Sequence, residues 1–93
     1  MTTFVLTYDL IKEETSADYK PLIDELTRLG AHRYQASAWL LKLNNTAKEV
    51  HDHVRKWLDA DDALWVSEFT RDYAHSRSRQ GTTDWLSKNQ PTR

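Results

Sequence analysis

Three stretches of the chain carry hydrophobic, aromatic and β-branched residues in the short, bounded runs that are typical of strands. They are residues 3–9, residues 31–43 and the sequence LWVSEFT at residues 64–70. The second stretch is longer than an average strand. We therefore expect it either to bend or to fold into a hairpin near residues 35–37, although no Gly, Asn or Pro marks a tight turn there.

The polar connector after the first strand leads into a segment with the spacing of an amphipathic helix, residues 18–29. Its apolar residues recur at intervals of three and four positions: Tyr19, Leu22, Ile23, Leu26 and Leu29. Gly30 then occupies the usual position of a helix C-terminal stop. We expect Asp18 to cap the N-terminus, because Pro21 then falls in the first turn, where its missing N–H costs little.

A second helix is predicted after Asn44 and Asn45. Thr46 and Glu49 have the T-x-x-E spacing of a capping box. The apolar stripe of this helix consists of Val50, Val54, Trp57 and Leu58. Beyond the third strand region the chain is irregular and basic, and TTDWLSK at residues 82–88 predicts one short helical turn capped by Thr82 or Thr83.

The element order is β-α-β-β-α-β, which is the split arrangement of ferredoxin-like folds. We predict an α+β protein with a four-stranded antiparallel sheet, formed by residues 1–70, and a basic C-terminal extension at residues 71–93. Right-handed crossovers place the first strand in the middle of the sheet. Asp9, the IKEET loop, the 35–37 bend and the DADD loop then gather at one acidic edge.

Two helices cover only one face of such a sheet, yet the strands carry large apolar residues at positions that point to both faces. Val5, Leu40 and Trp65 alternate with the residues that the helices would bury. A second apolar face exposed to water would be a patch of the size that marks interfaces. We therefore expect a homodimer that packs sheet against sheet, with the extension either partly ordered or packed on the partner subunit.

Composition narrows the class of protein. A hydrophobic content of 39% with 29% charged residues and no cysteine fits a cytoplasmic globular protein without disulfides or thiolate metal sites. No apolar run is long enough for a membrane helix, and no basic leader precedes the first strand. Residues 1–70 hold 8 Lys/Arg against 12 Asp/Glu, and residues 71–93 hold 5 against 2. A broad basic face for nucleic acid is therefore absent from the body of the chain.

Several short motifs resemble one known family. A hydrophobic strand ends in Tyr8-Asp9-Leu10, a helix closes in Leu29-Gly30, and the sequence RYQASAW follows at residues 33–39. In this order and spacing the chain resembles the small CRISPR-associated Cas-two family and its VapD-like and SinR-like relatives. The resemblance covers about residues 3–70, and it places the hairpin break near Ser37.

The resemblance implies a ferredoxin-like homodimer and a role for Asp9. In some members, the aspartate after the first strand comes from both subunits, holds Mg²⁺ and hydrolyses phosphodiester bonds in RNA or DNA. Other members act as non-catalytic dimeric modules. For this chain the expectation is a Mg²⁺-dependent endonuclease, acting on RNA more than on DNA, with Asp9 as catalytic residue and metal ligand. The alternative is a scaffold that binds a protein partner, as a CRISPR accessory or toxin–antitoxin component.

Other residues are weaker candidates for contact with nucleic acid, and each has a structural alternative. They are Tyr8, Arg33, Gln35, Ser37, Arg71, Arg77 and Arg79. Tyr8 is expected in the core or an interface, and Ser37 is expected to stabilise a turn or to donate to Asp9.

The remaining candidates are histidines, aspartates and tryptophans. His51 and His53 lie two apart on a helix and point in different directions, so we expect them not to share a metal ion. Residues 59–62 are expected to form a solvated loop, with a second metal ligand as the alternative. Trp39 and Trp65 are expected to pack in a dimer interface, with base stacking as the alternative.

Overall fold

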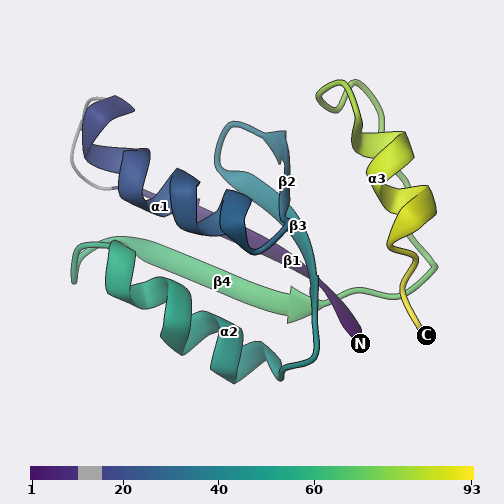
Figure 1. The fold of residues 1–93 in the computed structure, drawn as a ribbon, viewed down its shortest axis with the longest axis horizontal. Helices are drawn as coiled ribbons and strands as arrows, with labels where there is room; N and C mark the ends of the chain where they lie inside the picture. Colours follow the sequence, from purple (N-terminus) through teal and green to yellow (C-terminus); the bar gives the residue numbers. More distant parts are fainter. Residues whose placement is uncertain (11–15) are drawn as a thin grey trace.

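The structure is a computed structural model that describes residues 1–10 and 16–93. Its secondary structure follows the expected order, as Figure 1 shows: β1 (Thr2–Asp9), α1 (Ser16–Arg28), β2 (His32–Gln35), β3 (Ala38–Leu43), α2 (Ala47–Val54) with a 3₁₀ turn (Arg55–Trp57), β4 (Ala63–Glu68) and α3 (Thr82–Lys88). The four strands are ordered β2-β3-β1-β4, and each neighbouring pair is antiparallel. The predicted central position of the first strand is confirmed. The IKEET loop falls outside the described residues.

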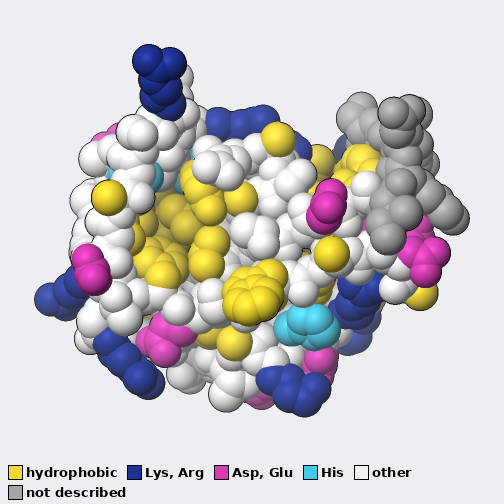
Figure 2. Space-filling view, turned by 180° about the vertical axis from the view of Figure 1, so that it is seen from behind, with side chains coloured by type: hydrophobic (Ala, Val, Ile, Leu, Met, Phe, Trp, Pro, Cys, Tyr) yellow, Lys and Arg dark blue, Asp and Glu magenta, His cyan; other side chains and the backbone are white. Residues whose placement is uncertain are grey.

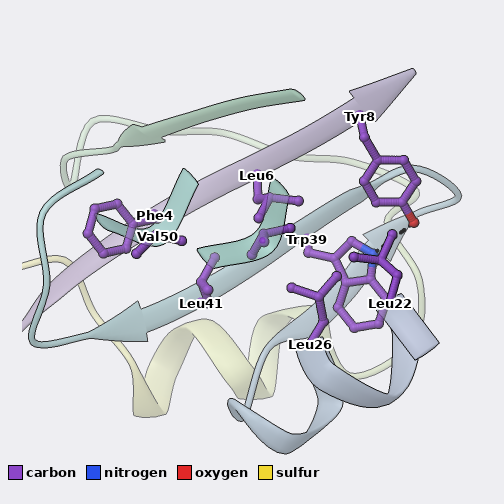
Figure 3. Packing of buried hydrophobic residues seen from close by; sticks show 9 residues of the cluster. Phe4, Leu6, Tyr8, Leu22, Leu26, Trp39, Leu41 and Val50 are labelled. Atoms are coloured by element: carbon purple, nitrogen blue, oxygen red, sulfur yellow. Dashed lines mark hydrogen bonds between the residues drawn. The ribbon is translucent and has the colours of Figure 1, made fainter. Parts of the chain in front are cut away.

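The core lies between one face of the sheet and the helices α1 and α2 (Figure 1). Phe4, Leu6 and Tyr8 point to this face from β1, because side chains in a strand alternate between faces. Figure 3 shows them packed against side chains from β3, α1 and α2, among them Leu41 and Leu26. Leu6, Leu26 and Leu41 are completely buried. We call this side the helix face of the sheet.

The helix α1 differs from its prediction at the start and agrees with it at the end. It begins at Ser16, so the expected cap at Asp18 is wrong and Pro21 lies inside the helix. Pro21 is exposed, and its missing N–H removes only the single bond to the carbonyl four residues earlier. At the C-terminus Gly30 has a φ of 78°, and its N–H and that of Ala31 donate to Thr27 and Leu26, as in a Schellman motif.

The predicted hairpin and capping box are both confirmed. The turn at Ala36 and Ser37 separates β2 from β3, and the register shifts within β2 beside it. At the start of α2, the Thr46 hydroxyl accepts from the backbone N–H of Glu49 at 3.2 Å. The Glu49 carboxylate accepts from the Thr46 N–H at 2.9 Å. The reciprocal pair satisfies two donors that the first helical turn leaves open.

The C-terminal extension is ordered against its own sheet. It lies beside β2 and β3, on the side of the sheet opposite α1 and α2 (Figure 1). The backbone N–H of Arg79 donates to the Tyr34 carbonyl at 3.2 Å, and the Trp85 indole N–H donates to the Gly30 carbonyl at 3.0 Å. This face, which we call the outer face, is therefore partly covered from within the same chain.

The last residues of the extension run along the start of β1. The Thr3 hydroxyl donates to the Asn89 carbonyl at 3.2 Å, and the Lys42 ammonium donates to the Gln90 carbonyl at 2.7 Å. Thr3 is 1% exposed, and Pro91 is also buried. This end of the outer face is closed, whereas Trp65 on β4 remains 66% exposed.

The short helix predicted at residues 82–88 is confirmed, but its expected caps are wrong. Gly81, with a φ of 93°, occupies the N-cap position and no side chain caps the helix. The Thr82 hydroxyl instead donates to the Arg79 carbonyl at 2.7 Å and lies 2.7 Å from Nε2 of His32. Burial lowers the pKa of His32.

Among the described residues, no helix is long and apolar enough to cross a bilayer.

Candidate functional site

Asp9 is the last residue of β1, and its side chain belongs to the outer face. It pairs with Ala63 on β4. Thr7, two positions earlier on the same face of β1, pairs with Trp65. Asp9 and Trp65 are both exposed. The carboxylate therefore stands at the open half of the outer face, beyond the part that the extension covers.

Two hydrogen bonds with the β2–β3 hairpin fix the end of β1 that leads to Asp9. The Tyr8 N–H donates to the Ser37 carbonyl at 3.1 Å, which ties the end of β1 to the hairpin turn. In the core, the Trp39 indole N–H donates to the Tyr8 hydroxyl at 3.2 Å (Figure 3). Tyr8 is 7% exposed, so it positions the strand end from inside the protein. The interpretation of Tyr8 as a core residue fits this placement.

The sequence RYQASAW that carries the family resemblance mainly builds the turn. Arg33 donates from Nε and Nη2 to the Ala36 carbonyl at 2.9 and 2.6 Å. Its guanidinium also lies 5.7 Å from the centre of the Trp39 ring, a cation–π contact. Gln35 is exposed beside the turn, and Ser37 contributes its carbonyl to β1. The turn thus holds the end of β1 and, through it, Asp9.

The acidic loop between α2 and β4 is built around Arg55. This side chain donates to the carbonyls of Asp62, Asp59 and Ala60 at 2.5, 2.6 and 2.8 Å. The Asp62 carboxylate accepts from the Asp59 N–H at 2.9 Å and is 5% exposed. The expectation of a solvated loop is therefore wrong for Asp62, because its carboxylate is used to close the loop. Asp59 and Asp61 are exposed.

The described residues were searched for groups of side chains that could hold a metal ion. In the part of the chain that the structure describes, no three His, Asp or Glu side chains gather in a way that would hold an ion. Asp9 offers a single exposed carboxylate, a hard oxygen donor of the kind that Mg²⁺ prefers.

The two histidines of α2 have separate partners, in agreement with the expected divergence. His51 lies 3.0 Å from the Asp52 carboxylate, and His53 lies 2.5 Å from the Glu25 carboxylate on α1. Glu25 also accepts two hydrogen bonds from Arg28, at 2.6 and 2.7 Å. Arg28 and then His53 are the main causes that lower the pKa of Glu25 from 4.5 to about 2. This cluster joins α1 to α2 and lies on the helix face, away from Asp9.

The three arginines of the extension that were candidates for contact with nucleic acid fall into two groups. Arg71 donates from Nε to the Pro91 carbonyl at 2.9 Å, and its N–H donates to the Arg93 carbonyl at 2.7 Å. It therefore ties the two ends of the extension together. Arg77 and Arg79 lie in the loop before α3, where both side chains are exposed.

The expected pairing of two tryptophans is wrong. Trp39 lies opposite Leu6 on the helix face and is 3% exposed, whereas Trp65 lies opposite Thr7 on the outer face. Only Trp65 is available to an interface.

A hollow of about 210 Å³ beneath the extension, with Val5 and Leu40 in its lining, was not predicted. The hollow is also lined by Phe69, Tyr73 and Leu86. These large apolar residues could have indicated from the sequence that the segment packs against the sheet.

Comparison with known proteins supports the fold alone. A scan against models of protein families finds no match. The structure is similar to the crystal structure of a hypothetical protein, TT1823 from Thermus thermophilus, with a TM-score of 0.62 and 18% sequence identity. The match covers 84% of this chain and 94% of that chain. At this identity the similarity establishes a shared arrangement of strands and helices.

Proposed function

We propose that this chain is a ferredoxin-like member of the Cas-two and VapD-like group that forms a homodimer through its outer face. In the proposed dimer, Asp9 and Asp9 of the partner subunit face one another and bind Mg²⁺. The dimer hydrolyses phosphodiester bonds, with RNA favoured over DNA. The observation that carries the proposal is the exposure of Asp9 on the same open half of the outer face as Trp65.

The surface around Asp9 favours a second copy as the occupant. An exposed tryptophan is among the side chains that contribute most when an interface buries them. Trp65 is two positions from Ala63, the residue that pairs with Asp9, so a contact centred on β4 would include the carboxylate. A two-fold axis through this region brings the same residue from each copy to one place.

The residues present fit a weakly bound hard cation. One carboxylate binds Mg²⁺ poorly, and two bind it better without needing a cage of protein ligands. When bound, the ion would neutralise phosphate charge and lower the pKa of a water molecule. The chain's part is to orient Asp9, which the bonds from Tyr8 to Ser37 and from Trp39 to Tyr8 accomplish. The exposed Asp59 and Asp61 repel phosphate at this edge when no cation is bound.

The experiment compares cleavage of labelled RNA and DNA by the purified protein with and without Mg²⁺. We expect Mg²⁺-dependent cleavage that Asp9→Asn abolishes while the dimer persists in sedimentation. Asp24→Asn, an exposed carboxylate on α1, is the matched control and should cleave normally. Cleavage that survives Asp9→Asn would contradict the proposed role of Asp9.

One observation favours the alternative of a non-catalytic dimeric module. Among the described residues, Asp9 is the carboxylate at the end of β1 on this face, and it belongs to no group of three metal-ligating side chains. A dimer that cleaves neither RNA nor DNA at any Mg²⁺ concentration would establish this alternative. Such a result would leave Asp9 as a polar residue of an interface.

A further inference from the structure

Two hollows adjoin each other beneath and beside the C-terminal extension, and neither belongs to the Asp9 region. The first has a volume of about 210 Å³ and lies between the outer face and the extension, with Val5 and Leu40 on the side of the sheet. The second has a volume of about 360 Å³ and is lined by residues 75–84. His75 and Thr82 line both, so the two hollows are neighbours. Figure 2 shows hydrophobic side chains gathered on this face of the molecule.

The first hollow has the lining that a flat aromatic ring prefers. Phe69 and Tyr73 pack edge to face with ring centres 5.6 Å apart, and Tyr73 stacks on His75 with ring centres 6.5 Å apart and an interplanar angle of 25°. Tyr34 also lines the hollow, and burial raises the pKa of its hydroxyl, which therefore stays neutral. The volume is below the range of pockets for drug-sized ligands, which suits a single ring system.

The second hollow has the chemistry that binds phosphate. Arg77 and Arg79 line it together with Ser76 and Ser78, and one acidic residue, Asp84, belongs to the same lining. Guanidinium groups bind phosphate oxygens through paired hydrogen bonds. The two arginines give the loop a net positive charge against the single acid.

The loop that carries these arginines is held in a defined shape. Arg77 has a φ of 55°, a left-handed backbone conformation that residues with a side chain rarely adopt. Such conformations persist where the surroundings fix them, and they concentrate at ligand-binding sites. The bond from the Arg79 N–H to the Tyr34 carbonyl at 3.2 Å ties the loop to β2. The backbone that carries the two arginines is therefore held beside the aromatic hollow.

We propose that the two hollows together bind one nucleotide, with its base between the outer face and the extension and its phosphate at Arg77 and Arg79. The same chemistry is present in a free mononucleotide and in one nucleotide of a single-stranded RNA. This site is separate from Asp9 and does not depend on cleavage activity.

The first test is a titration of the ¹⁵N-labelled full chain, followed by its amide chemical shifts. The probes are AMP, adenosine, inorganic phosphate and a short single-stranded oligoadenylate RNA. We expect AMP to shift amides that line the two hollows, including Val5, Leu40 and Thr82, and to bind at least tenfold more tightly than adenosine or phosphate. Tighter binding of AMP than of the RNA identifies a free nucleotide as the ligand, and the reverse order identifies a nucleotide within RNA.

Variants separate the two halves of the site. Arg77→Ala combined with Arg79→Ala should weaken AMP binding at least tenfold and leave adenosine binding unchanged. Lys48→Ala combined with Lys56→Ala removes the same charge from α2 and the 3₁₀ turn, and it should have no effect. Ala74→Trp should fill the first hollow from its exposed rim and abolish binding of both AMP and adenosine.

Three results would overturn the proposal. They are the absence of saturable shifts in the wild-type protein at millimolar AMP, shifts confined to residues outside both hollows, and equal binding of AMP by the wild type and the double arginine variant. The first two need no variant, so they decide the matter even where Ala74→Trp fails to fold.

Discussion

The two faces of the sheet are covered in different ways. On the helix face, α1 and α2 bring regularly spaced apolar side chains onto the strands, and Leu6, Leu26 and Leu41 are completely buried. On the outer face, the C-terminal extension is attached through hydrogen bonds that each involve a backbone amide or carbonyl, and it leaves a hollow of about 210 Å³. Trp65 at the other end of that face is 66% exposed. Helices with a regular apolar stripe pack densely on the sheet, whereas the short extension closes only part of its face and leaves a hollow and an exposed tryptophan.

The largest expected effect comes from two neighbouring leucines of β3 that point to opposite faces. Leu41→Ala, on the helix face, should lower the free energy of unfolding by about 2–5 kcal/mol, because it leaves a cavity in a dense core. Leu40→Ala should cost less than about 2 kcal/mol, because its side chain already borders an open hollow. Urea denaturation measures both. An equal or larger loss for Leu40→Ala would contradict the contrast between the faces.

Trp65 tests the open half of the outer face. Trp65→Lys should raise the dissociation constant of the proposed dimer about thirtyfold or more, since losing a central tryptophan costs about 2 kcal/mol or more. The stability of the monomer should change little, because the side chain is exposed. Sedimentation equilibrium measures the dissociation constant. Thr27→Lys, at an exposed position of α1, is the control, and equal effects of both variants would rule out a contact centred on Trp65.

The attachment of the extension gives a smaller effect. Trp85→Phe removes the hydrogen bond from the indole N–H to the Gly30 carbonyl at 3.0 Å and keeps a large aromatic ring. The expected loss is about 0.5–1.5 kcal/mol in the free energy of unfolding. Thermal denaturation measures it, and hydrogen exchange should show faster opening of residues 82–88 alone. Uniformly faster exchange throughout the sheet would mean that the extension is not a separate unit of stability.

The smallest effect is the pH dependence of the cluster on the helix face. Hydrogen bonds from Arg28 and His53 lower the pKa of Glu25 from 4.5 to about 2. Because the pKa in the folded state is lower, the carboxylate contributes stability that is fully present above pH 4.5 and is lost as the pH falls toward 2. Glu25→Gln should flatten this part of the stability profile, measured by urea denaturation between those pH values. Asp24→Asn should leave the slope in place.

The elements that the sequence predicted correctly are those with local signals. The Schellman end of α1 at Gly30 and the capping box of Thr46 and Glu49 each involve residues within one turn of each other. The strand order followed from the connections between elements. The start of α1 was missed because the prediction kept Pro21 in the first turn. In the structure Pro21 lies inside the helix, where it removes a single backbone hydrogen bond.

Contacts between distant residues were beyond prediction. The bond from Thr3 to Asn89 joins residues 86 positions apart, and no local pattern marks either partner. The burial of Asp62 depends on Arg55, whose three bonds to carbonyls turn an acidic loop inward. For the candidate site, Asp9 was placed at the correct strand end. The turn-building role of Arg33 was not foreseen, because its acceptor is a backbone carbonyl and not a ligand.

The most direct test of the account is a distance between two copies of the chain. The chain has no cysteine, so Ala63→Cys gives a single labelling site at the exposed residue opposite Asp9. Pulsed electron paramagnetic resonance of the spin-labelled protein should give one short distance between labels, because both copies place this residue near the two-fold axis. A labelled protein without dipolar coupling between copies, or with only a long distance, would contradict the shared Asp9 site.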